Sequence, residues 1–383
     1  MKLIGRLLLG IIAGILMGLF APLFLTQLLV TFKGLFGELL NFAVPLMILF
    51  YVMSGIGSLQ KGSGRVLGVT IGLSYLSTIT AGLLAFFAAS YILPEVVVVN
   101  SSDIDAGQHI QPYFTIGLPP LLAVSSALVT AFVFGVGISV TRSKELLKIT
   151  DHGRGVVELL LLKAIIPGLP IYICGVFAEM AAAGTVFNTI STFIWVLALA
   201  LFLHWVWLFV LYTGAGLGTG KNPLIMLRTM LPAYITAVGT LSSAAAIPVT
   251  VDCARKLKIN NHVVDFAIPL CATIHLSGSV ITITICTMAI MLMSLGGLPS
   301  MAMYIPFLMA LGVALVAAPG IPGGAVMASV GLMTSMLGFN DSAIALMIAL
   351  YLAQDSFGTA CNVVGDGAIA TVVDHISSDR WNS

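Results

Sequence analysis

Hydrophobic residues follow one another in long runs along this chain, and polar residues are confined to short stretches between them. The first six runs fall near residues 5–28, 35–59, 66–94, 115–140, 156–183 and 187–216. A helix needs about 20 apolar residues to cross a bilayer, so each run predicts a transmembrane helix. The first run has no small-residue cleavage site followed by polar sequence, so we interpret it as a helix rather than a signal peptide.

Beyond residue 220 the pattern becomes irregular. The run 224–257 is interrupted by "SSAAAIP", the run 261–294 by "ATIHLSGS" and the run 301–338 by "AAPGIPGG", before a last run at 341–374. Proline breaks helices and glycine permits unusual dihedral angles, and non-helical backbone at membrane depth must be buried in protein or line a wet cavity. We therefore predict two re-entrant hairpins, at 224–257 and 301–338, and a broken helix between them. Two kinked spanning helices are the alternative.

Charged residues orient these segments. Lys and Arg precede the first run and lie between the second and third and between the fourth and fifth, whereas the loop 94–112 carries three acidic residues and no basic one. The positive-inside rule then predicts a cytoplasmic N-terminus and an external loop. Basic residues flank both ends of 224–257, while 301–338 has uncharged flanks. Hairpins that enter from opposite faces are typical of secondary transporters.

Composition supports a multi-pass membrane protein. Of 383 residues, 59% are hydrophobic and 8% are charged, against about 25% charged in soluble domains. The net charge of +1 suggests no nucleic-acid partner, and five scattered cysteines predict neither a metal cluster nor a disulfide framework. The chain contains no nucleophile–base pair, metal-ligand cluster or phosphate loop, so we expect no enzyme and no resident cofactor.

The run 341–374 carries a polar stripe. Asp355, Thr359, Asn362 and Asp366 are spaced i, i+4, i+7 and i+11, which places them on one face of a helix. A central Asp in a membrane helix costs about 2.5–3.5 kcal/mol on insertion scales, so this face is expected to meet protein or water. Basic residues are nearly absent from the apolar runs, so a bound cation or ammonium group is the simpler partner. A structural hydrogen-bond network is the alternative.

A histidine lies at the interruption of the run 261–294. His275 stands close to Ser277, Gly278 and Ser279. Neutral and charged imidazole interconvert near physiological pH, so His275 is a candidate proton-linked switch, and a hydrogen-bonded core histidine is the plain alternative. His204, within another run, is expected to be interfacial or packed.

Several motifs, in order, resemble one family. These are "FAVPLMILFYVMSGIGSL", the serine-rich "TLSSAAAIPVT", "IPLCATIHLSGS", "GIPGG" and "DSFGTACNVVGD". The chain resembles, over essentially its whole length, the dicarboxylate/amino acid:cation symporters, which include the glutamate transporter homologues and their serine/threonine relatives. The resemblance implies an all-α polytopic membrane protein with eight transmembrane helices and two re-entrant helical hairpins, working as a homotrimer of elevator-type units.

The resemblance also implies a division into domains. Residues 1–65 (helices 1–2) and 95–185 (outer loop, helices 4–5) would form the scaffold and trimer contact. Residues 66–94 (helix 3) and 186–383 (helix 6, hairpin 1, helix 7, hairpin 2, helix 8) would form the transport domain. The protein would lie in the plasma (inner) membrane, in contact with lipid.

Site residues follow from the same resemblance. Asp355 falls where the family binds the substrate ammonium, Asn362 where it binds the α-carboxylate, and Thr359 beside the side-chain pocket. Asp366 falls where an Asp holds a sodium ion. The remaining substrate-binding positions lie in the first hairpin, the broken helix and the second hairpin: Ser242, Ser243, Ser279 and Gly323.

Two departures from the family bear on the substrate. Gly358 stands where acidic-substrate members have an Arg that pairs the second carboxylate, and Tyr351 replaces an acidic residue that partners this Arg. Burying an unpaired carboxylate would be costly, so glutamate and aspartate are disfavoured. The glycine is also expected to leave volume for a neutral side chain.

Further departures bear on the coupling ion. His275 and Ser277 replace the Asn and Asp of the seventh-helix motif, and Ile79 replaces a small hydroxyl residue, although Thr78 remains. We therefore expect the deepest site not to bind sodium. Two sodium sites remain possible: Asp366 with Asn362, and Thr273 with the carbonyls of 315–318, including Ala318. Coupling to protons through His275 is the competing hypothesis.

The sequence predicts a cation-coupled symporter of a neutral amino acid, with serine, threonine and alanine as leading substrates. One alternative is a proton-coupled transporter, and another is an acidic amino acid symporter with an altered site. A different class is a non-transporting receptor, or an anion-conducting channel, on the same scaffold.

Overall fold

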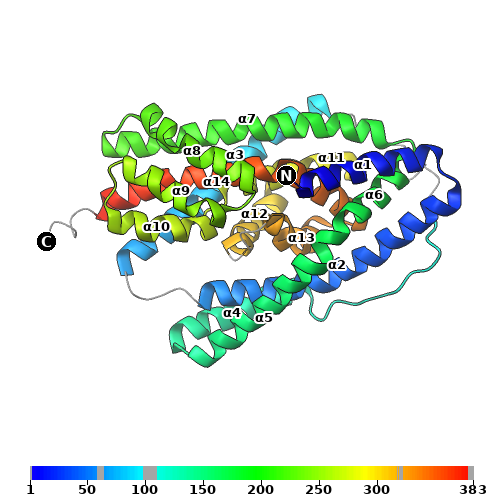
Figure 1. Ribbon diagram of the computed structural model, residues 1–383, viewed down its shortest axis with the longest axis horizontal. Coiled ribbons are helices and arrows are strands. Elements are labelled where there is room, and N and C mark those ends of the chain that lie inside the picture. Colours follow the sequence, from blue (N-terminus) through cyan, green and yellow to red (C-terminus); the bar gives the residue numbers. More distant parts are fainter. Residues whose placement is uncertain (1, 58–63, 98–109, 317, 319–321, 378–383) are drawn as a thin grey trace.

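The computed structural model describes residues 2–57, 64–97, 110–316, 318 and 322–377. These residues fold into helices, with no strand among them (Figure 1). The helices are α1 Lys2–Phe20, α2 Leu23–Gly57, α3 Gly64–Val96, α4 Val124–Thr141, α5 Lys144–Leu160, the π-helical turn η1 Leu161–Ile165, α6 Ile166–Ala182, α7 Val186–Thr219, α8 Pro223–Thr240, α9 Ser243–Lys256, α10 Asn261–Ile274, α11 Ser277–Leu295, α12 Met301–Val316, α13 Gly324–Leu337 and α14 Asp341–Ser377.

Six helical segments are long and apolar enough to cross a membrane. They are Leu23–Gly57, Val66–Val96, Lys144–Ala182, Thr189–Thr219, Asn261–Ser294 and Asp341–Ser377. The first and fourth predicted spans are shorter, because only Gly5–Phe20 and Val129–Thr141 remain as apolar helix there. The multi-pass helical class is confirmed, whereas a count of eight spans stays a prediction.

The first predicted boundary is wrong. The run 5–28 was expected to be one helix, but α1 ends at Phe20 and α2 begins at Leu23. Pro22 lies between them, and a proline disfavours helical dihedral angles in the residue before it. From Leu23 the helix continues through the supposed loop to Gly57, because Lys33 and Gly34 do not interrupt it.

Two pairs of short helices occupy the predicted hairpins. α8 packs against α9, and α12 packs against α13. The first pair is joined at Leu241, whose φ of 53° lies in the left-handed region, and Ser242, whose Oγ caps α9 by accepting from the Ala245 N–H. The four helices have 14 to 18 residues, which is shorter than a typical span. Helix–break–helix pairs of this length are what a re-entrant interpretation requires.

α14 and the broken helix α10–α11 are the most deeply buried long segments. In the most apolar 18-residue stretches of Asn261–Ser294 and Asp341–Ser377, 89% of the residues are buried. In the corresponding stretches of the other four long segments, 39–56% are buried. α14 packs against α7, α8, α10 and α11, and α11 also packs against α3. The polar stripe on α14 is therefore expected to meet protein rather than lipid.

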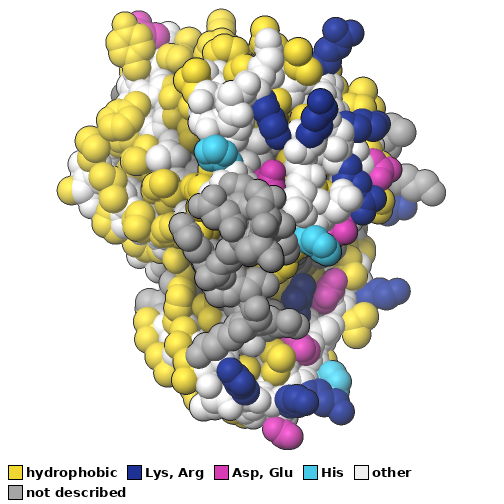
Figure 2. Space-filling model, turned by 90° about the vertical axis from the view of Figure 1, so that its left-hand side faces the viewer, with side chains coloured by type: hydrophobic (Ala, Val, Ile, Leu, Met, Phe, Trp, Pro, Cys, Tyr) yellow, Lys and Arg dark blue, Asp and Glu magenta, His cyan; other side chains and the backbone are white. Residues whose placement is uncertain are grey.

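The remaining helices form a second group. α1, α2, α4, α5 and α6 pack mainly among themselves. This group meets the first where α12 and α13 lie against α2, α13 against α4, and α14 against α6. Figure 2 views one end of the molecule, where Lys and Arg side chains gather on one side and hydrophobic side chains on the other. The membrane orientation stays a prediction.

Candidate functional site

The polar stripe of α14 is buried. Asp355, Thr359, Asn362 and Asp366 are each at most 6% exposed. The α14 helix continues through all four, so its backbone groups bond within the helix and the four side chains need other hydrogen-bond partners. The stripe divides into a half near the second hairpin and a half near the break between α10 and α11.

Asp355 contacts the tip of the second hairpin. Its Oδ2 accepts the backbone N–H of Gly323 at 2.8 Å, and the Thr359 Oγ1 lies 3.5 Å from its Oδ1. Gly323 caps α13 with a φ of +77°, and a Cβ there would lie 2.9 Å from the Leu352 side chain. Glycine is thus needed for the N–H at the beginning of α13 to reach the carboxylate. The neighbouring tip residues 319–321 lie outside the described residues.

Asn362 caps the second half of the broken helix. Its Oδ1 accepts the N–H groups of Gly278 (2.7 Å) and Ser279 (3.3 Å), and its Nδ2 donates to the Ser279 Oγ (2.9 Å). The first N–H groups of a helix have no partner within it. The break after Ile274 exposes such groups at the beginning of α11, and Asn362 supplies the acceptor.

Tyr351 connects the two predicted substrate groups. Its hydroxyl donates to the Ser279 Oγ at 3.2 Å, and it lies one turn before Asp355 on α14, close enough to interact electrostatically with that carboxylate. A continuous polar network therefore runs from Gly323 through Asp355, Tyr351 and Ser279 to Asn362.

Asp366 belongs to a separate chain of three residues. Its Oδ1 lies 2.9 Å from Nδ1 of His275, and Nε2 of His275 lies 2.8 Å from Oγ of Ser77 on α3. Asp366 and His275 are each 1% exposed. Gly365 allows this approach, because a Cβ there would lie 2.7 Å from the imidazole. A neutral imidazole gives this chain ordinary hydrogen bonds, and a protonated one gives a buried ion pair.

Ser77 was missed by the sequence reasoning. It lies in "LSYLST", one position before Thr78, the residue that the family resemblance implicates there. A small hydroxyl residue in a membrane helix usually bonds its own backbone, so its type gives no functional signal. Only the packing of α3 against the broken helix shows that it contacts His275.

The predicted sodium ligands do not share one set of contacts. Asp366 is bonded to His275 and Asn362 caps α11, as described above. The Thr273 Oγ1 donates to the Leu270 carbonyl at 2.7 Å, and the buried Thr78 Oγ1 has no partner among the described residues. Ala318 is buried, but residue 317 of the expected carbonyl set lies outside the described residues. The expected ligation of one cation by Asp366 and Asn362 therefore needs side chains to move.

The serines of the first hairpin lie at the beginning of α9. The Ser242 Oγ accepts from the Ala245 N–H at 3.3 Å, and Ser243 is the first residue of α9. Both are partly exposed, unlike the α14 stripe. Their capping geometry nevertheless leaves the beginning of α9 with the N–H groups that a carboxylate would need.

Gly358 is where the structure corrects the sequence interpretation. A Cβ at Gly358 would lie 3.3 Å from the Thr282 Oγ1 and 3.5 Å from the Gly278 carbonyl, and a Cβ at Gly278 would lie 2.4 Å from the Gly358 carbonyl. A side chain at Gly358 would therefore be crowded by Thr282 in this arrangement, so the volume expected there is not open. Gly278 is the glycine that the crossing requires, because its Cβ would collide with the backbone of α14.

His204 supports the same helix crossing from α7. Its Nε2 lies 3.0 Å from the Gly278 carbonyl and 3.1 Å from the Thr282 Oγ1, and the side chain is 1% exposed. Of the two expectations for this residue, the packed one is confirmed. The sequence signal was a single histidine in an apolar run, which did not identify its partners.

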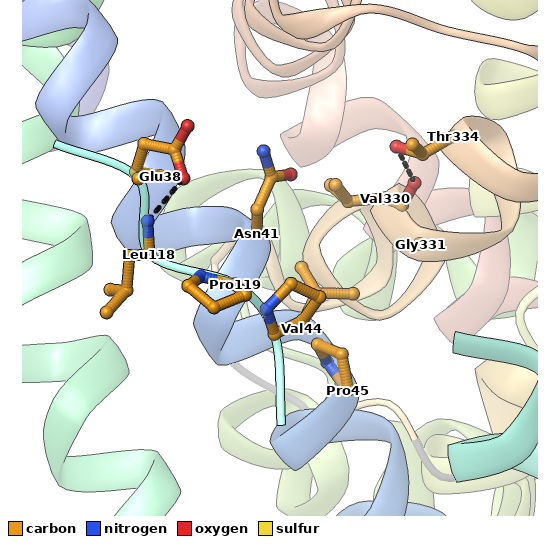
Figure 3. A pocket seen from close by; sticks show the side chains of 11 residues that line it. Glu38, Asn41, Val44, Pro45, Leu118, Pro119, Val330, Gly331 and Thr334 are labelled. Carbon is orange, nitrogen blue, oxygen red and sulfur yellow. Dashed lines mark hydrogen bonds between the residues drawn. The ribbon is translucent and has the colours of Figure 1, made fainter. Parts of the chain in front are cut away.

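A cavity of about 430 Å³ lies between the two groups of helices. In Figure 3, α2 contributes Glu38, Asn41, Val44 and Pro45, and α13 contributes Val330, Gly331 and Thr334. Residues 117–120 close its third side, and the Leu118 N–H donates to Glu38 Oε2 at 3.1 Å. This cavity does not include the polar stripe.

These features define an all-helical, multi-pass membrane protein with a buried polar site between broken helices. Such a site is suited to carrying a small polar solute. The chain belongs to the sodium:dicarboxylate symporter family, whose model matches residues 3–376. This confirms the resemblance seen in the sequence. The family is one of transporters rather than enzymes, and its members move a substrate together with a cation.

Proposed function

We propose that the protein is a cation-coupled importer of a neutral α-amino acid, with serine, threonine and alanine as leading substrates. The pairing of Asp355 with Asn362 on the buried face of α14 carries this proposal. A carboxylate suits an ammonium group, and an amide beside the N-terminus of α11 suits a carboxylate. Gly323 and Ser279 hold these groups in the present arrangement, so an entering substrate has to replace them.

A neutral substrate side chain is favoured by what surrounds the network. Among the described residues, no Lys or Arg forms a hydrogen bond or ion pair with Asp355, Tyr351 or Asn362. A second substrate carboxylate would lose its hydration without gaining a counter-charge, which is costly. The Nε2 of His204 is already shared between two oxygens. A dicarboxylate or acidic amino acid is therefore the weaker alternative.

Sodium is the coupling cation in the leading version of the proposal, with Asp366 as its charged ligand. A second candidate is a proton-coupled symporter, favoured by the bond between Asp366 and His275. A protonated imidazole would neutralise the buried carboxylate as a sodium ion does. In that version Ser77 orients the other ring nitrogen.

The transport mechanism that we propose is an elevator in a homotrimer. The group formed by α1, α2, α4, α5 and α6 would be the fixed scaffold, and α3 with α7–α14 would move across the membrane. This division assigns residues 1–65 and 95–185 to the scaffold, and residues 66–94 and 186–383 to the transport domain. Support comes from the separate packing of the two groups and the few elements that join them.

Uptake by the purified protein in liposomes tests these proposals. Labelled serine, threonine, alanine and aspartate are supplied with a sodium gradient or a pH gradient, imposed separately. We expect sodium-driven uptake of a neutral amino acid that Asp355→Asn abolishes. Uptake that follows the pH gradient alone and is lost in His275→Asn would support the proton version. Binding without uptake under either gradient would favour a receptor, and substrate-independent anion current would favour a channel.

A further inference from the structure

We infer that Tyr351 and Ser279 recognise the side chain of the substrate and select for a hydroxyl group. The site would then prefer serine to alanine, and threonine to 2-aminobutyrate. This inference rests on the proposed function, because it concerns the same site, and it assigns to Tyr351 a role in specificity.

The position of the hydroxyl pair supports this assignment. The Tyr351 hydroxyl donates to the Ser279 Oγ at 3.2 Å, and both side chains are at most 2% exposed. The pair lies between Asp355, which is one helical turn after Tyr351 on α14, and Asn362, whose Nδ2 donates to the Ser279 Oγ. In an α-amino acid the side chain is attached to the α-carbon, which also carries the ammonium and the carboxylate groups. A substrate held by Asp355 and Asn362 therefore has its side chain beside these two hydroxyls.

The hydrogen-bonding capacity of the pair is not used up. The Tyr351 hydroxyl donates to the Ser279 Oγ, and among the described residues its oxygen accepts no hydrogen bond. Its proton can also be redirected to a new acceptor that the substrate brings. A hydroxyl group both donates and accepts, so a substrate hydroxyl can accept from Tyr351 and donate to the Ser279 Oγ.

A methyl group in the same place can do neither. The Tyr351 hydroxyl would then keep only its bond to the Ser279 Oγ, which also accepts from the Asn362 Nδ2, and any separation that the substrate causes would leave the buried Tyr351 hydroxyl unpaired. Sites that hydrogen-bond a substrate hydroxyl reject analogues lacking it strongly. Because the two hydroxyls here can still bond each other, we expect a smaller preference, roughly tenfold.

The competing explanation is purely structural, with the pair only joining α14 to α11. Tyr212 provides a matched control, because its hydroxyl also bonds α14, donating to the Val364 carbonyl at 2.7 Å from a fully buried side chain. Its backbone acceptor belongs to neither Asp355 nor Asn362. A structural role predicts that Tyr351→Phe and Tyr212→Phe behave alike toward every substrate.

The experiment measures binding of L-serine, L-threonine, L-alanine and L-2-aminobutyrate to the full-length purified protein by calorimetry, at one pH and sodium concentration. We expect Tyr351→Phe to weaken serine and threonine binding roughly tenfold and to change alanine and 2-aminobutyrate less than about twofold. Tyr212→Phe should leave the serine-to-alanine ratio unchanged. Ser279→Ala provides a second variant, with the same expected direction, should Tyr351→Phe fold poorly.

Two results would overturn the inference while the proposed function stands. One is an equal loss for all four ligands in both Tyr351→Phe and Ser279→Ala, and the other is no change in the serine-to-alanine ratio in either. If the wild-type protein binds none of the four, the proposed function fails and the inference fails with it.

Discussion

The backbone N–H of Gly323 donates to the Oδ2 of Asp355 at 2.8 Å. The hairpin tip thus holds the acceptor that a substrate ammonium would need. Since Gly323 has a φ of +77° and a Cβ there would meet Leu352 at 2.9 Å, we expect Gly323→Ala to pull the N–H away from the carboxylate. The αL conformation alone costs an L-residue about 1 kcal/mol.

Gly338 gives the matched control for this prediction. It has a φ of +72° but open space around its Cβ, so Gly338→Ala carries the conformational cost without the collision. We expect Gly323→Ala to lower both the melting temperature and substrate affinity, and Gly338→Ala to lower the melting temperature alone. Equal affinities in the two variants would show that the tip contact has no part in binding.

The second prediction concerns the buried pair of His275 and Asp366. Leaving one partner of a buried hydrogen bond unsatisfied costs about 1–3 kcal/mol, and removing one partner of a buried ion pair costs about 3–5 kcal/mol; in both cases removing both partners costs less than the sum. We expect His275→Asn and Asp366→Asn each to destabilise the protein strongly, and the double variant to recover part of the loss. Reversible denaturation of the four proteins gives the coupling energy.

A control for this cycle comes from His152, which is exposed on α5. His152→Asn should change stability by no more than about 0.5 kcal/mol, as surface substitutions usually do. Additive effects of the His275 and Asp366 substitutions would mean that their 2.9 Å contact contributes no coupling.

The sequence predicted the elements of this fold better than it predicted their contacts. The interruptions at 241–242 and 275–276 were found because serine, histidine and glycine stand out in an apolar run, whereas Pro248, which also marked the first interruption, lies inside α9. The stripe of Asp355 and Asn362 was found because helical spacing places charged and amide groups on one face. These are local signals, and neighbouring residues in the sequence determine them.

Contacts between distant segments left no such signal. Ser77 bonds His275 across 198 positions of sequence, and His204 bonds the Gly278 carbonyl across 74. A glycine in the sequence is compatible with an open pocket or with close packing against the backbone of another helix. Gly358 was interpreted as the first of these. Only the packing of α11 on α14 decides between them.

The third prediction concerns the junction between the two groups of helices. The Asn41 Nδ2 on α2 donates to the Asp341 Oδ1 at 3.2 Å, and the Tyr172 hydroxyl on α6 donates to the Asp341 carbonyl at 3.3 Å. These contacts have to break if α14 moves past α2 and α6. We therefore expect a cross-link between Asn41→Cys and Asp341→Cys to stop uptake and to leave substrate binding measurable.

The control cross-link lies within one group. The Ser54 Oγ on α2 donates to Oδ1 of Asp151 on α5 at 2.7 Å, and an elevator does not separate these helices. Cross-linked Ser54→Cys/Asp151→Cys protein should transport at the rate of its uncross-linked form. Full uptake by protein that is cross-linked between residues 41 and 341 would be incompatible with the proposed elevator.

The fourth prediction orders three glycine substitutions by the space around each Cβ. A Cβ added at Gly214 on α7 would have no neighbour within 4 Å. A Cβ at Gly358 would lie 3.3 Å from the Thr282 Oγ1, and a Cβ at Gly278 would lie 2.4 Å from the Gly358 carbonyl. In a helix, alanine is favoured over glycine by about 0.5–1 kcal/mol, whereas forcing atoms into a packed site costs about 1–3 kcal/mol. Gly214→Ala should therefore be neutral or stabilising, Gly358→Ala mildly destabilising and Gly278→Ala the most destabilising, as measured by melting temperature.

For the same reason we expect Gly358→Arg to lower stability without creating aspartate uptake, since the guanidinium would have no room between α11 and α14. A stable Gly358→Arg variant that takes up aspartate would show that the crossing of α11 and α14 opens enough to admit a side chain.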